Sequence, residues 1–131
     1  MSKPNPQYVD KFTSHYFKTM LWSESDNTDD QGGDPLEDNY DVEDFDLDTL
    51  REHSETCKQF VTDNWGDLED LDAEHAGHNF WLTRRGHGAG FWDGDYEEAV
   101  GERLTASCNS EKYSLDYACP FVGDDGKLYI E

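Results

Sequence analysis

Residue types that bind ligands or metals gather in one stretch of the sequence. His78, Arg84, Arg85, His87 and Asp93 lie in or beside a Gly-His-Gly-Ala-Gly run. The backbone N–H groups of a glycine-rich loop can hold a phosphate, and neutral imidazoles are good zinc ligands. These five residues therefore form one candidate site, for a small ligand or a metal.

A simpler interpretation of the same stretch competes with a ligand site. No Lys-Ser or Lys-Thr pair follows the glycines, as it does in a phosphate-binding P-loop. The spacing of Glu74, His75 and His78 is loose, and no cysteine pair completes a set of four zinc ligands. We favour a tight turn whose glycines let aromatic side chains pack, and we expect no metal and no cofactor.

Catalysis would need a nucleophile or an acid and base pair. The sequence offers His87 with Asp93, and Cys108 or Cys119 with a histidine. None of these stands in a recognised local signature. Because the chain has 31 acidic residues, a histidine near an aspartate is expected by chance. We therefore predict that the protein is not an enzyme.

Carboxylates form a second candidate site, in the middle of the chain. Residues 23–74 contain 20 acidic and 2 basic residues, in a protein whose net charge is −21. Such a segment repels nucleic acid and membranes and attracts basic proteins. Carboxylates three or four positions apart on a helix lie about 5–6 Å from each other, so they can imitate a row of phosphates. The candidate partner-binding residues are Asp44, Asp46, Asp48, Glu52, Glu55, Asp63, Asp67 and Asp70.

The acidity also has an inert interpretation, as an adaptation to high salt or for solubility. Adaptation to salt spreads acidic residues over the whole surface, whereas here they are concentrated in one segment. This concentration favours a charged partner.

Length and composition indicate a single domain over residues 1–131. Leu, Ile, Val and Phe make up 23 residues, which together with the net charge is typical of disorder. The 18 aromatic residues are nevertheless enough for a packed core. No apolar run reaches the roughly 20 residues of a membrane span, no signal-peptide core is present, and three scattered cysteines make no disulfide framework. We expect a cytoplasmic protein without a membrane segment.

Two helices are predicted in the first half of the chain. Apolar residues recur every three or four positions over residues 6–22, which indicates an amphipathic helix. Residues 23–44 combine acidic residues with paired glycines and a proline, so we predict an irregular, mobile connection. Asp46 or Asp48 can cap a second helix that runs to about Asn64. Gly66 is expected to end or kink it, with at most a short helical piece before His75.

The second half is predicted to contain two hairpins and a third helix. Residues 78–84 and 91–93 flank the glycine run and are predicted to form a β-hairpin. A capping box at residues 95–98 starts a helix to about Cys108. Segments 113–122 and 127–130 flank an Asp-Gly turn. The predicted fold class is α+β, with about three helices packed on a small antiparallel sheet of two hairpins and a long acidic loop.

The stretch HNFWLTRRGHGAGFWD at residues 78–93, with GERLT at 101–105 and VGDDGKLY at 122–129, resembles a family of small, mostly uncharacterised bacteriophage proteins. The resemblance covers roughly the last 55 residues. It implies a phage origin and an α+β domain, but it supplies no catalytic role, because the family has no agreed activity. With the acidity, it predicts an inhibitor in the host cytoplasm, monomeric or homodimeric, that binds a basic nuclease, CRISPR effector or DNA-repair enzyme as a DNA mimic and does not bind nucleic acid itself. The alternative is a small ligand- or metal-binding domain at the glycine-rich run.

Overall fold

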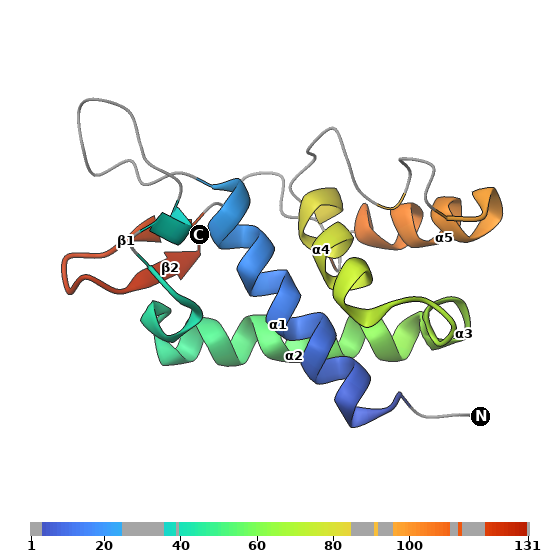
Figure 1. Cartoon of the computed structure of the whole chain (residues 1–131), viewed down its shortest axis with the longest axis horizontal. Helices are drawn as coiled ribbons and strands as arrows, with labels where there is room; N and C mark the ends of the chain where they lie inside the picture. Colours follow the sequence, from blue (N-terminus) through green and yellow to red (C-terminus); the bar gives the residue numbers. More distant parts are fainter. Residues whose placement is uncertain are drawn as a thin grey trace.

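A computed structural model describes residues 4–24, 36–38, 40–84, 91, 96–110, 113 and 120–130. The helices are α1 (Pro6–Ser23), α2 (Leu47–Asp63), α3 (Trp65–Leu68), α4 (Ala73–Arg84) and α5 (Glu98–Cys108). Two 3₁₀ turns, η1 (Leu36–Asp38) and η2 (Val42–Asp44), precede α2, and strands β1 (Pro120–Val122) and β2 (Leu128–Ile130) form an antiparallel pair. In Figure 1, α1 crosses α2 at an angle and the small sheet lies beside the start of α2.

The first two predicted helices are confirmed, and their caps explain where they start. The Asn5 side chain accepts a hydrogen bond from the Gln7 N–H at 2.9 Å, with Pro6 in the first turn of α1. The Asp46 carboxylate accepts from the backbone N–H groups of Asp48 and Thr49 at the start of α2. Helix α2 ends at Asp63, before the expected breaker Gly66, and Gly66 lies inside the short helix α3.

The predicted strand over residues 78–84 is wrong, because these residues form the last turns of α4. From Asn79 to Arg84 every residue of this helix is buried. A helix that is covered on all sides has no polar stripe, so its sequence looks like a buried strand. The second strand of that hairpin falls on residues 91–93, of which only Phe91 lies within the described part.

The predicted α+β class is therefore also wrong. The described residues form five α-helices and a single two-stranded sheet, rather than three helices on two hairpins. The turn at residues 124–126 is confirmed, and Gly126 has the positive φ of 79° that such a turn needs. The third predicted helix exists as α5 but starts at Glu98, later than the capping box implied.

The sheet is tied to the segment that leads into α2. Phe45 forms a parallel bridge with Leu128, and the Asp46 N–H donates to the Leu128 carbonyl oxygen at 2.9 Å. Both Phe45 and Leu128 are buried. The hairpin thus fixes the position of the α2 N-terminus.

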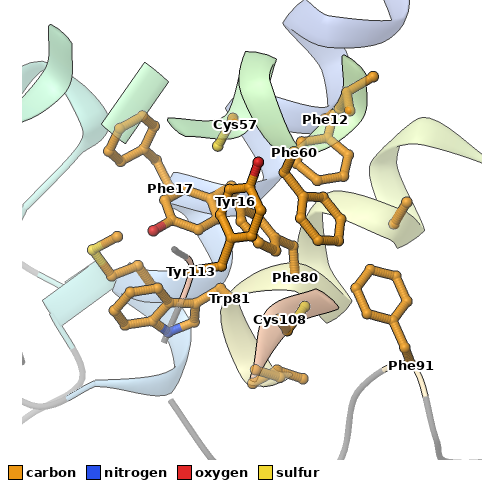
Figure 2. Close-up of a cluster of buried hydrophobic side chains, with 14 of the residues drawn as sticks. Phe12, Tyr16, Phe17, Cys57, Phe60, Phe80, Trp81, Phe91, Cys108 and Tyr113 are labelled. Atoms are coloured by element: carbon orange, nitrogen blue, oxygen red, sulfur yellow. The ribbon is translucent and has the colours of Figure 1, made fainter. Parts of the chain in front are cut away.

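The core is aromatic and lies where α1, α2 and α4 meet. Figure 2 shows Tyr16 among Phe17, Phe60, Phe80 and Trp81. The backbones of α1 and α4 are in close contact at Gly77, where a Cβ atom would overlap the carbonyl group of Phe12. The side-chain hydrogen of this glycine is thus part of the helix packing.

Candidate functional site

The exposed carboxylates of α2 form the candidate partner-binding surface. Asp48, Glu52 and Glu55 are all exposed and lie on one face of the helix, because they are separated by four and three positions. The side chain of Asp48 is 91% exposed, and Arg51 approaches it only to 3.7 Å. Asp70, beyond α3, is exposed as well. These four side chains can receive a partner's cations.

The other four predicted partner-binding residues also have contacts within the fold. Asp44 accepts a hydrogen bond from the Asp41 N–H, and Asp46 caps α2. Asp63 accepts from the Tyr113 hydroxyl at 2.6 Å. Asp67 receives two-point hydrogen bonds from the Arg103 guanidinium, at 2.6–3.1 Å. Asp44 and Asp63 remain exposed to a partner, whereas the charge of Asp67 is already balanced.

The acidic line of α2 is shorter and less continuous than expected. Helix α2 ends at Asp63, so Asp67 and Asp70 do not continue the same helix. The two basic residues of the acidic segment, Arg51 and Lys58, both lie on α2 and are both exposed. The carboxylates of α2 therefore alternate with cations, and the strongest excess of negative charge lies before and after this helix.

A buried polar cluster links three helices inside the core. The Arg84 guanidinium, on α4, donates to the Tyr113 carbonyl oxygen and to the Tyr16 hydroxyl, both at 2.6 Å. The Tyr16 hydroxyl on α1 also bonds His53 Nδ1 on α2 at 2.9 Å. The guanidinium lies over the rings of Tyr16 and Phe80, at 5.9 and 5.1 Å from their centroids. Sequence reasoning missed this cluster, because the three residues are far apart in the chain.

Burial determines the protonation of this cluster. Burial, and to a lesser degree the nearby Arg84 charge, lowers the pKa of His53 to about 4. Burial raises the pKa of the Tyr16 hydroxyl and of the Cys57 and Cys108 thiols. Both cysteines therefore stay as thiols, which are poor nucleophiles. The cluster stabilises the fold and offers no reactive group to solvent.

The His53 pKa predicts a loss of stability in acid. The folded pKa of about 4 is below the ordinary value of 6.5, so between these two values the unfolded chain binds the proton. The free energy of unfolding should fall by about 1.4 kcal/mol per pH unit in this window, to a total of about 3 kcal/mol. Urea titrations at pH 7, 6 and 5 measure it. The variant His53→Gln should show a much smaller slope, and an equal slope in both proteins would contradict the assignment.

The alternative ligand site is only partly covered by the described residues. Arg84 is 5% exposed and bonded within the core, so its charge does not face solvent. The His78 ring is tilted against the Trp22 ring, with 5.5 Å between their centroids, and its Nδ1 lies 2.9 Å from Thr19 Oγ1. Arg85, His87 and Asp93 lie outside the described residues. Within the described ranges, no three His, Cys, Asp or Glu side chains are placed to hold a metal.

Comparison with known proteins adds no family. No protein-family model, curated protein or solved structure matches the chain. Among the helices of the described part, none is long and apolar enough to cross a membrane. The charges and the surface shape of the chain therefore have to indicate its function.

A groove on the surface between α1 and α2 is the second feature that sequence reasoning missed. It has a volume of about 610 Å³, and the apolar side chains of Val9, Phe17, Val42 and Leu50 contribute to its lining. The signal for it is the four-residue spacing of Leu50, Ser54 and Lys58, which places these residues in one stripe of α2. The groove also needs α1 opposite this stripe, and a pattern in one helix does not predict that arrangement.

Proposed function

We propose that this chain is a protein-binding inhibitor of phage origin, which presents carboxylates to the basic nucleic-acid site of a host nuclease, CRISPR effector or DNA-repair enzyme. The partner is a basic protein, and the inhibitor itself does not bind nucleic acid. Inhibition follows because the carboxylates occupy cationic side chains that would otherwise contact phosphates.

The observation that carries the proposal is the set of exposed carboxylates without a strong internal contact. The chain has 31 acidic and 10 basic residues, so at least 21 carboxylates have no Lys or Arg of their own. On α2, Glu52 and Glu55 are exposed and form no ion pair with another described residue, while Asp48 has only the distant Arg51. Repulsion among such groups costs stability, and a cationic partner relieves it.

The salt dependence of partner binding tests this role. The parent protein, immobilised, should capture a basic host protein from a bacterial lysate at low ionic strength. Because the contacts are charge pairs, the complex should dissociate as salt rises, and duplex DNA should compete for the captured protein. Mass spectrometry identifies the partner, and its DNA-binding or nuclease activity should fall when the inhibitor is added.

The matched variant carries Asp48→Asn, Glu52→Gln and Glu55→Gln. None of these three carboxylates accepts a hydrogen bond from another described residue. Its affinity for the captured protein should fall by about tenfold or more. Its melting temperature should stay the same or rise, since repulsion on α2 falls. Three results together would show that the acidity is inert: the complex is stable at high salt, the captured protein still binds DNA within it, and the captured protein binds the variant as tightly as the parent.

A further inference from the structure

The α1–α2 groove is part of a longer surface depression. Two further hollows adjoin it along α1, one towards Pro4 and Pro6 and one towards Leu21 and Tyr40. They share Val9, Asp10 and Lys58 with the central groove at one end and Lys18 and Asp41 at the other. The three hollows therefore form a continuous channel along most of α1, a helix of 18 residues that is about 27 Å long.

The shape of the channel comes from the size of the facing side chains. Ser14 on α1 and Ser54 on α2 line it where the two helices face each other. Larger residues there would fill the space, as the aromatic residues do between α1 and α4. Val9, Val42 and Leu50 are only partly buried and pack on the core from the channel side. The channel thus exposes apolar surface that no described element covers.

The walls of the channel are acidic. Its three hollows are lined by seven carboxylates and two lysines. The carboxylates are Asp10, Glu37, Asp38, Asp41, Glu43, Asp44 and Glu55. No ion pair within the described residues neutralises any of the seven. An apolar surface between acidic walls is complementary to an element that is apolar on one face and basic on its flanks.

We propose that this channel is the docking site for a basic amphipathic α-helix of the partner protein. The inference rests on the proposed function and specifies where and how the partner is held. The apolar face of that helix covers Val9, Val42 and Leu50, and its lysines or arginines reach the carboxylates on the walls. Charge alone gives weak and unselective binding, whereas burial of an apolar face adds affinity and selects one class of partner.

Charge argues against two other occupants. A second copy of this chain has the same net charge of −21 and would be repelled. Residues 25–35, which lie outside the described part, contain four aspartates and no lysine or arginine. This segment of the chain is therefore a poor ligand for an acidic channel.

The test uses a dye-labelled synthetic peptide of eighteen residues with leucines on one helical face and lysines on the other. A peptide of the same composition in scrambled order is the matched probe, because it has the same charge and no apolar face. Fluorescence anisotropy should give at least tenfold tighter binding for the amphipathic peptide. Amide NMR shifts should change at Val9, Ser14, Val42 and Ser54.

Three variants of the full chain locate the binding. Ser54→Trp fills the channel without changing charge and should weaken binding of the amphipathic peptide at least tenfold. The pair Asp10→Asn and Glu43→Gln should weaken it more than the control pair Glu98→Gln and Glu102→Gln, which removes two exposed charges on α5, outside the channel. Circular dichroism melts establish that each variant is folded.

The outcomes separate the channel from the proposed function. No binding of the amphipathic peptide, equal binding of the two peptides, or full binding by a folded Ser54→Trp protein would overturn the channel as a docking site. Salt-sensitive capture of a host protein would in each case leave the charge-mediated inhibitor standing. The opposite result is also possible. If the amide variant of α2 captures the host protein at all salt concentrations, the proposed function fails. If the peptide nevertheless binds in the channel, the docking site remains.

Discussion

Replacing Gly77 with alanine should destabilise the protein by about 3 kcal/mol or more, a large part of the stability of a small domain. The new Cβ atom would overlap the Phe12 carbonyl oxygen and lie 2.9 Å from the carbonyl carbon. Both are backbone atoms, so the clash cannot be relieved by a side-chain rotation. Helix α1 has to move away from α4, which opens the contact that buries Phe12 and Phe80. Urea titration followed by circular dichroism measures the loss.

Gly66→Ala is the control, because it makes the same chemical change in an open position. Gly66 is exposed in α3, and a Cβ atom there meets nothing within 4 Å. Alanine is the better helix former, so this variant should be more stable than the parent by about 0.5–1 kcal/mol. A Gly77→Ala protein as stable as the parent would mean that α1 and α4 are not in backbone contact.

Replacing Trp81 with alanine should cost about 3–5 kcal/mol. The Trp81 side chain is fully buried, contacts Tyr16 edge to face at 5.5 Å, and donates its Nε1–H to Ser23 Oγ at 2.9 Å. Alanine leaves a cavity at the junction of α1 and α4. It also removes the hydrogen bond that the Ser23 hydroxyl accepts at the end of α1. Thermal melts followed by circular dichroism measure the effect.

Two variants separate the causes of this loss. Trp81→Phe keeps an apolar ring and removes the hydrogen bond, so its cost should be smaller, about 1–2 kcal/mol. Trp22→Ala removes the same side chain from a position that is 54% exposed and should cost less than about 1 kcal/mol. If Trp22→Ala and Trp81→Ala cost the same, the packing around α4 differs from that described. Trp92 lies outside the described residues.

The elements with a visible amphipathic period or a local signal could be predicted from the sequence. Helices α1 and α2 each keep one polar face, and Asp46 provides the cap. The Asp-Gly turn before β2 needs only local backbone chemistry. In contrast, every residue of α4 from Asn79 to Arg84 is buried, and this run carries no periodic signal that distinguishes a helix from a strand. One error at α4 therefore changed the predicted fold class.

In the candidate site, too, features with a local sequence signal could be predicted, and features that depend on contacts between distant residues could not. The exposure of Asp48, Glu52 and Glu55 follows from the polar face of α2, so the sequence could predict it. The pairing of Asp67 with Arg103 and the bond from Tyr113 to Asp63 join distant parts of the chain, and no local pattern indicates them. The same is true of the channel, which exists only because α1 lies beside the stripe of α2 that contains Ser54.

The bridge between Phe45 and Leu128 has a consequence for folding during translation. The ribosome releases α1, α2 and α4 well before β2, and these three helices contribute most of the aromatic core. The strand partner of Phe45 is made much later, so the start of α2 stays open on the nascent chain until the hairpin emerges. We therefore expect η2, which forms part of the channel wall, to reach its final position last. A partner would meet a complete docking site only after synthesis of the hairpin.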